Sequence, residues 1–176
     1  MTDDSWADDG WETAPAVGRW RGWMALVLSI IGFGIGLYLT IDHFTGTLPV
    51  CSATGIINCA KVTTSPQSEV FGIPVALLGL LFFTAMIAIN LPPLWRAGYR
   101  WVTWARLVMV VGGMGFVVYL LSAELFTIKA ICLWCTGVHV LTFLLFVLVV
   151  ASFPAMAGNA QWVDGAADEV EPVTGP

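Results

Sequence analysis

Four apolar stretches, each about as long as a membrane-spanning helix, alternate with shorter polar stretches along the chain. They cover Trp23–Ile41, Phe71–Leu91, Trp101–Ala123 and approximately Ile131–Ala151. A helix of about 20 apolar residues crosses the roughly 30 Å hydrocarbon core of a bilayer. Arg106 is the one charge inside these stretches, and it lies in the first turns of the third, where we expect its side chain to reach the headgroups. The pattern predicts four transmembrane helices.

Composition and charge support this prediction. Hydrophobic residues make up 58% of the chain and charged residues 11%, roughly half the charge of an ordinary globular protein. Most of the acidic residues lie in two tails, 1–21 and 154–176, so the net charge of −5 belongs to the tails. Soluble enzymes, nucleic-acid binders and disordered chains are excluded, because residues 22–153 have too few polar groups to cover a soluble surface. We expect one membrane domain over residues 22–153 between two disordered tails.

The first apolar stretch is predicted to be a retained helix. Its apolar core is too long for a signal peptide, and no Ala-x-Ala cleavage site follows it. Most of the basic residues outside the apolar stretches precede the first helix or lie between the second and third: Arg19, Arg21, Arg96 and Arg100. The positive-inside rule therefore predicts that both termini are cytoplasmic and that loops 42–70 and 122–130 face outward. The charges in these outer loops are expected to be solvated: Asp42, Lys61, Glu69 and Glu124.

The four cysteines fall into two pairs, and the predicted topology places both on the oxidising side. Cys51 and Cys59 lie in the first outer loop, whereas Cys132 and Cys135 begin the fourth helix. A Cys-x-x-Cys disulfide is strained and readily reducible, and a helix N-terminus stabilises a thiolate, so this pair indicates a redox couple. Two structural disulfides remain an alternative. A zinc site fits poorly with the eight-residue offset of the first pair, and Thr136 excludes a haem-attachment motif.

One polar residue continues the helical face that carries the second pair. His139 follows Cys135 by four positions, so it lies on the same side of the helix about one turn deeper in the bilayer. A dithiol at bilayer level above a deeper polar group indicates chemistry with a lipid-soluble molecule. A histidine that only packs in the core remains the alternative for His139.

Three segments together resemble the vitamin K epoxide reductase family, in particular its bacterial thiol-oxidase branch. They are Cys51-Ser-Ala-Thr-Gly-Ile-Ile-Asn-Cys59-Ala-Lys-Val-Thr-Thr-Ser65, Phe71-Gly-Ile-Pro-Val-Ala-Leu-Leu-Gly79 and Cys132-Leu-Trp-Cys135. The resemblance extends over about residues 20–151. It implies an all-α integral membrane protein: a four-transmembrane-helix bundle around a quinone pocket, with a short interfacial helix in the first outer loop.

The resemblance also implies a role for each cysteine. Cys135 would be the thiolate that faces the quinone, and Cys132 would be its disulfide partner. Cys51 and Cys59 would form a shuttle in the outer loop. The implied function is a quinone-dependent thiol oxidase that supports disulfide bond formation, and the alternative is a non-enzymatic membrane scaffold with two structural disulfides.

The implied quinone site involves Ser65 and His139. Ser65 would be a polar group near the quinone, although it is equally placed to cap a turn before Pro66. His139 stands where many relatives have a tyrosine, and the family's asparagine donor on the second helix falls here in an apolar stretch around Val75. Both departures argue against the vertebrate epoxide reaction.

The implied partners are the lipid bilayer, a membrane quinone of the menaquinone or ubiquinone type, and a thiol protein. Because the sequence contains no fused thioredoxin-like domain, the thiol partner is expected to be a separate extracytoplasmic thioredoxin-fold protein of the DsbA type. No metal and no nucleic acid are expected. The implied location is the inner (cytoplasmic) membrane of the cell, with both termini in the cytoplasm and the cysteines outside.

Overall fold

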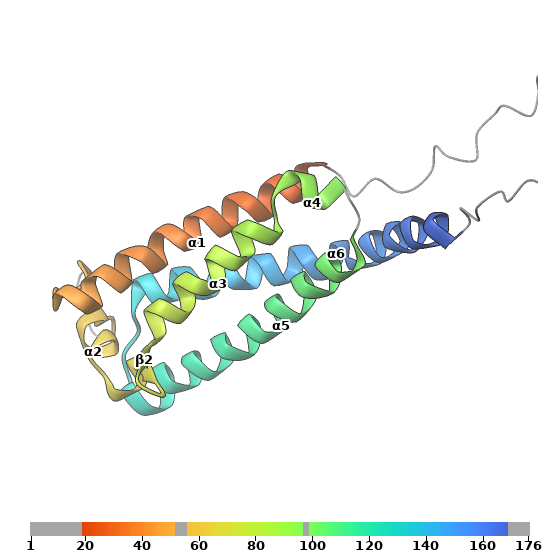
Figure 1. Cartoon of the computed structure of the whole chain (residues 1–176). Helices are drawn as coiled ribbons and strands as arrows, with labels where there is room; N and C mark the ends of the chain where they lie inside the picture. Colours follow the sequence, from red (N-terminus) through yellow and green to blue (C-terminus); the bar gives the residue numbers. More distant parts are fainter. Residues whose placement is uncertain (1–18, 52–55, 97–98, 169–176) are drawn as a thin grey trace, which may run out of the picture.

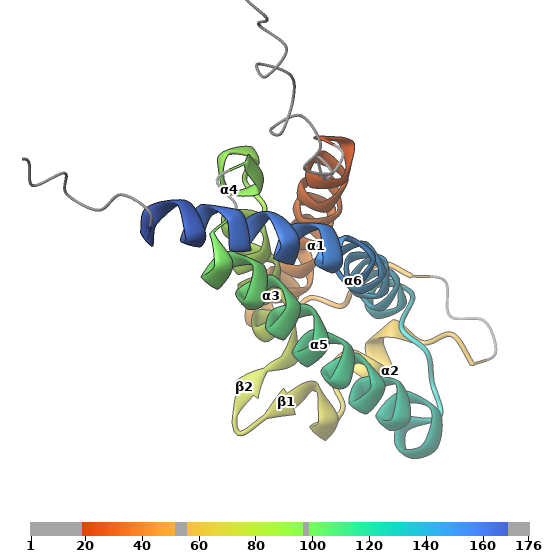
Figure 2. The ribbon, with the colours of Figure 1, turned by 90° about the vertical axis from the view of Figure 1, so that its right-hand side faces the viewer.

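Four long helices form an elongated bundle in a computed structural model, which describes residues 19–51, 56–96 and 99–168. They are α1 (Arg19–Thr45), α3 (Val75–Ile89), α5 (Arg100–Ser122) and α6 (Leu133–Asp168) (Figure 1). Helix α1 packs against α3 and α6, and α5 packs against α6 and more loosely against α3. In the view along the bundle, α1 and α5 therefore occupy opposite corners (Figure 2).

Short elements connect the long helices. The connection from α1 to α3 contains α2 (Cys59–Thr63), the 3-10 turn η1 (Pro66–Ser68) and a small antiparallel hairpin. Its strands are β1 (Glu69–Val70) and β2 (Ile73–Pro74), which pair Glu69 with Pro74 and Val70 with Ile73. Helix α4 (Pro92–Arg96) connects α3 to α5, and η2 (Ala123–Ile128), a π-helical turn, follows α5 and precedes α6.

Three helical segments are long and apolar enough to cross a membrane among the residues that the structure describes: Trp20–Thr45, Arg100–Ile128 and Leu133–Ala157. The predicted second span is shorter than expected, since α3 has 15 residues and begins at Val75 rather than Phe71. The hairpin takes up the first residues of that apolar stretch, and Phe71 and Gly72 have positive φ at its turn. Pro74 ends the hairpin with φ −57° and ψ 130° and is the N-cap of α3, so the helix begins directly after it. The bundle is thus three long apolar helices and one shorter one.

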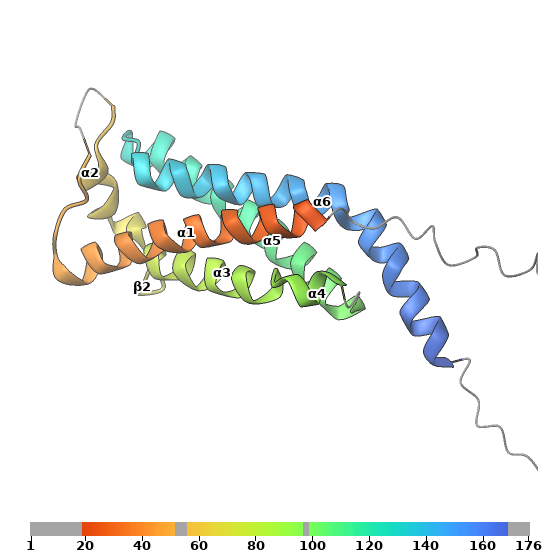
Figure 3. The same cartoon turned by 90° about the horizontal axis from the view of Figure 1, so that it is seen from above.

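Helix α6 extends well beyond the predicted end of the membrane domain. It continues to Asp168 through Pro154, whereas the sequence predicts disorder over 154–176. A proline inside a helix removes one backbone hydrogen bond and commonly bends the helix without ending it. Figure 3 shows α6 changing direction as its C-terminal part leaves the bundle. Residues 1–18 and 169–176 of the two predicted tails lie outside the described residues.

The core of the bundle is formed by apolar side chains from all four long helices. Its fully buried members include Phe83, Met86, Val110, Leu145 and Val149. The small-xxx-small spacing of two glycines allows α1 to approach α3 closely. A Cβ at Gly32 would collide with the Phe83 ring, and one at Gly36 would lie 3.2 Å from the backbone of Leu80.

The expectation that Arg106 reaches the headgroups is wrong. Its side chain is 2% exposed, and Nη2 and Nε donate to the carbonyl oxygen of Ile89 at 2.6 and 3.1 Å. The guanidinium also lies 4.4 Å from the ring centroid of Trp95. The last carbonyls of a helix lack intrahelical partners, so a cation at the end of α3 satisfies them and stacks on an aromatic ring.

The two ends of the bundle carry different parts of the chain. The start of α1, helix α4 and the C-terminal part of α6 lie at one end, and α2 and the hairpin lie at the other (Figure 1). The cysteines are at the second end. The structure therefore confirms that the ends of the bundle segregate as the charge pattern predicts, and the cytoplasmic location of the first end stays a prediction.

Candidate functional site

The loop that carries the first cysteine pair is shaped by a capped short helix. Asn58 has extended backbone (φ −151°), and its side-chain oxygen accepts a hydrogen bond from the Lys61 N–H at 2.9 Å, as an N-cap does. Helix α2 then begins at Cys59. This confirms the short helix expected after Cys59. Lys61 is exposed, as the sequence predicts.

The first pair forms a disulfide, and the second pair is a dithiol in this structure. Cys51 is bonded to Cys59, which is 1% exposed. Cys132 is fully buried and Cys135 is half-buried, and both are free thiols. The Cys135 N–H donates to Cys132 Sγ at 3.4 Å. Hydrogen bonding from the Cys135 side chain, and then from the backbone of Cys135 and Trp134, lowers the pKa of the Cys132 thiol despite its burial.

A short stretch of parallel strand pairing holds the two cysteine segments side by side. Ile57 and Ile131 form a parallel bridge. The Asn58 N–H donates to the Ile131 carbonyl at 3.0 Å, and the Ile131 N–H donates to the Ile56 carbonyl at 2.9 Å. These residues lie one to three positions before Cys59 and Cys132, so the bridge brings the two pairs together across more than 70 residues of sequence.

The tryptophan inside the Cys-x-x-Cys segment makes a second connection. Trp134 Nε1 donates to the Val50 carbonyl at 3.1 Å, directly before Cys51. The Val50 N–H donates to the Tyr38 hydroxyl at 3.0 Å, and the Tyr38 and Trp134 rings are 5.0 Å apart. As a result, the four cysteines belong to one cluster, whose other members are Val62, Ile128, Ala130 and Trp134.

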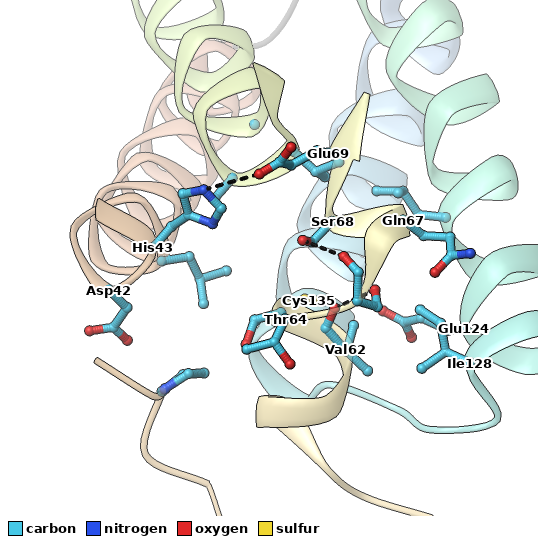
Figure 4. Close-up of a pocket in the computed structure, with 18 of the residues that line it drawn as sticks. Asp42, His43, Val62, Thr64, Gln67, Ser68, Glu69, Glu124, Ile128 and Cys135 are labelled. Carbon is cyan, nitrogen blue, oxygen red and sulfur yellow. Dashed lines mark hydrogen bonds and ion pairs between the residues drawn. The ribbon is translucent and has the colours of Figure 1, made fainter. Parts of the chain in front are cut away.

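A cavity of about 480 Å³ lies beside this cluster, in the size range of small-molecule sites. Cys135 lines it, whereas Cys132 does not. Its walls come from α1, the loop after Cys59, α3, the end of α5 with η2, and α6 (Figure 4). The structure thus brings Cys135, Ser65 and His139, three of the residues singled out from the sequence, to one space.

Ser65 and His139 differ in how they are bonded. The Ser65 hydroxyl donates to the Val62 carbonyl at 2.8 Å, so it does not cap the 3-10 turn η1 that follows it. His139 is 5% exposed, and its Nδ1 has no hydrogen-bond partner among the described residues. A buried nitrogen of this kind is expected to have a partner. An imidazole that faces a cavity without one is suited to hydrogen-bond a ligand there.

Glu124 contradicts the expectation of a solvated loop charge. It is 4% exposed and lines the cavity, because the π-helical turn η2 continues α5 past Ser122 and carries the carboxyl inside. One feature of the sequence is compatible with a buried position for this acid: apolar pairs flank Glu124, Leu120-Leu121 on one side and Leu125-Phe126 on the other. Hydropathy alone assigns such an acid to a loop.

Two further titratable residues at the cavity come from α1, and one comes from the hairpin. Asp42 is half-buried and accepts a hydrogen bond from the Thr47 hydroxyl at 2.9 Å, so it is only partly solvated. His43 Nε2 lies 3.9 Å from Glu69 Oε1, and that carboxyl is exposed as predicted (Figure 4). The sequence does not predict a role for His43, because a lone histidine at a helix end carries no recognisable pattern.

A comparison with known families is consistent with this arrangement. The model of the vitamin K epoxide reductase family matches residues 23–150, which include all four cysteines and the whole cavity lining. The match covers most of the chain and confirms the resemblance seen in its cysteine segments. Membership of this family, which is in general linked to quinones, implies a membrane redox function that acts on thiols and disulfides. The chain belongs to the vitamin K epoxide reductase family.

Proposed function

We propose that the protein is a quinone-dependent thiol oxidase, which carries electrons from a reduced thioredoxin-fold protein outside the cell membrane to a quinone within it. The observation that carries this proposal is the single cluster of a disulfide, Cys51–Cys59, and a dithiol, Cys132 and Cys135, with only Cys135 open to the adjoining cavity. Such an arrangement supports a relay in which one pair faces the protein partner and the other faces a membrane-soluble acceptor.

The first step is thiol–disulfide exchange with the partner. A thiolate of the partner attacks Cys51, which is half-buried and therefore more accessible than Cys59. Cys59 leaves as a thiolate, and a mixed disulfide joins Cys51 to the partner. The partner's second thiol then attacks its own sulfur in that bond. This releases Cys51 and leaves the partner oxidised, with two electrons now held by Cys51 and Cys59.

The second step transfers these electrons inside the buried cluster. Cys59 attacks Cys132 of an oxidised Cys132–Cys135 disulfide, and Cys135 leaves as a thiolate. Cys51 then attacks Cys59, which restores the loop disulfide and releases Cys132. The cluster supports this exchange, because Cys59 and Cys132 are both buried in it and are held by the bridge between Ile57 and Ile131.

The third step returns the inner pair to the disulfide. Cys135 transfers electrons to a quinone in the cavity, and the Cys132 sulfur closes the disulfide with Cys135. The two thiols lose two protons and two electrons, and these convert the quinone to a quinol. His139 is proposed to hydrogen-bond a quinone oxygen through the Nδ1 that has no partner in the described part of the chain, with Ser65 as a further polar contact.

The test measures both reactions on the purified full-length protein. A reduced thioredoxin-fold dithiol protein is added with a short-chain quinone, and quinone reduction is followed by its ultraviolet absorbance. We expect one quinol for each partner disulfide formed. A protein whose disulfides are only structural would oxidise no partner and reduce no quinone, and that result would establish the scaffold alternative.

The proposal also places the cysteines outside the cytoplasm, with both termini inside. A membrane-impermeant maleimide should then label the thiols of reduced, intact cells. A cytoplasmic cysteine introduced in the 92–100 turn serves as the control that should react only after the membrane is broken. Labelling of the native thiols only after rupture would contradict this topology.

A further inference from the structure

Glu124 is a buried acid for which the relay described above has no use. Its side chain is 4% exposed, and it lines the same cavity as Cys135 and His139. Within the described residues one ion pair is present, between His43 and Glu69. No basic side chain described there therefore lies within ion-pair distance of Glu124. An acid buried without a countercharge is unfavourable for folding, and an apolar residue would fill the position at lower cost.

The backbone at Glu124 is unusual as well. The residue lies in the π-helical turn η2, which ends at Lys129 in the left-handed conformation (φ 54°). π-Helical turns are rare and occur frequently at functional sites. Here the turn carries an acid that lines the cavity. An uncommon backbone conformation and a buried carboxyl thus occur at the same residue.

Glu124 shares the cavity with Cys135, the cysteine that lines it. The other titratable groups lining the cavity include His139 on α6, Asp42 and His43 on α1, and Glu69 on the hairpin. Asp42 and His43 lie across the cavity from Glu124 in Figure 4.

We propose that Glu124 is the proton relay of the quinone site, an assignment that rests on the proposed function. Closing the Cys132–Cys135 disulfide releases two protons, and reduction of the quinone consumes two. Glu124 accepts one of these protons from the dithiol and donates it to the nearer quinone oxygen, so the carboxyl ends each cycle as it began. The second thiol proton passes to water, and the other quinone oxygen takes its proton from water.

The experiment isolates the quinone step from thiol exchange. Full-length protein is reduced at Cys132 and Cys135 and mixed rapidly with a short-chain quinone. Glu124→Gln keeps the side-chain size but cannot carry the proton, and we expect quinone reduction about 10²-fold slower, the usual order for loss of a general acid–base group. Glu124→Asp should recover part of the rate. Asp164→Asn, the same acid-to-amide change on the part of α6 beyond Pro154, away from the cavity lining, is the matched control and should be near normal.

A solvent isotope effect separates proton transfer from a structural role. In D₂O, the slowed Glu124→Gln reaction should show a larger isotope effect than the wild-type reaction, because proton delivery now limits the rate. Exchange of the Cys51–Cys59 disulfide with a small dithiol should be unchanged and reports correct folding. A normal quinone rate in Glu124→Gln overturns the relay, and so does a slowed rate with an unchanged isotope effect.

The two proposals fail in different ways. If the wild-type protein reduces no quinone, the proposed function is wrong, and the relay is wrong with it. If the wild-type protein reduces quinone and Glu124→Gln does so equally well, only the relay is wrong. Should Glu124→Gln lose the Cys51–Cys59 exchange and so prove misfolded, Glu124→Met takes its place, because this apolar side chain of similar length also carries no proton. A normal quinone rate in that variant overturns the relay.

Discussion

Both ends of the bundle bury polar side chains, but the two ends bond them differently. At the end with α4, the Arg106 guanidinium donates to the Ile89 carbonyl and stacks on Trp95, and Trp95 Nε1 donates to Asn90 Oδ1 at 3.3 Å. Of the buried side-chain nitrogen and oxygen atoms described there, Asn90 Nδ2 alone lacks a hydrogen-bond partner. At the cysteine end, Glu124 and His139 line the cavity. Within the described residues, Glu124 has no countercharge and His139 Nδ1 has no hydrogen-bond partner.

This difference distinguishes polar groups that hold the fold from polar groups that are available for chemistry. A satisfied buried network contributes to one unique packing, whereas an unsatisfied group that faces a cavity is available to a ligand. The comparison predicts that substitutions at the α4 end reduce stability and leave the reaction intact. Substitutions at the cysteine end should slow the reaction and leave the stability of the fold nearly unchanged.

The largest effect is expected from the inner cysteine pair. Cys132→Ala or Cys135→Ala should abolish quinone reduction with any electron donor, because the inner disulfide no longer forms. Cys51→Ala and Cys59→Ala should abolish oxidation of the protein partner but keep part of the activity with a small dithiol that reaches Cys132 directly. Quinone absorbance with each donor checks this. Equal losses in the loop and inner variants with a small dithiol would contradict the division into shuttle and quinone-facing pair.

The next effect concerns His139, whose Nδ1 is proposed to bond the quinone. His139→Phe keeps an aromatic ring but removes the hydrogen-bonding nitrogens, and we expect quinone reduction to slow by about 10²-fold, as for loss of one oxyanion donor. His139→Tyr restores a donor and should recover much of the rate. Thiol trapping should show that both disulfides still form in each variant. Similar, near-normal rates in the two variants would mean that His139 only packs in the bundle.

The smallest effect on the reaction is expected at the opposite end. Arg106→Met leaves the Ile89 carbonyl without its charged donor, and we expect a loss of about 2 kcal/mol in the free energy of unfolding, the usual order for a hydrogen bond to a charged group. Thermal unfolding in detergent measures it, and Arg100→Met, at an exposed position, is the control. Quinone reduction per folded molecule should be unchanged. A large catalytic loss with normal stability would break the comparison between the two ends.

Much of the site was accessible from the sequence because its signals are local. The two cysteine pairs, the helix start at Cys132 and the four-residue spacing to His139 all depend on residues close to each other in the chain. The family resemblance of these segments implies a short helix in the first outer loop, and the structure confirms it as α2, which Asn58 caps. The family match over residues 23–150 bears out the resemblance that these segments carry.

The sequence by itself determined the membrane class, the pairing of cysteines by segment and the end of the bundle at which they lie. Only the tertiary structure decided which charges are buried. Arg106 meets a carbonyl 17 residues earlier in the chain, and Glu124 faces a cavity whose walls come from several helices. Hydropathy treats a charge as a mark of the surface, because it measures neighbours along the chain. Burial depends instead on neighbours in space. A buried charged residue is tolerated when the packed fold supplies a partner, as for Arg106, or when it takes part in the chemistry of a cavity, as we propose for Glu124.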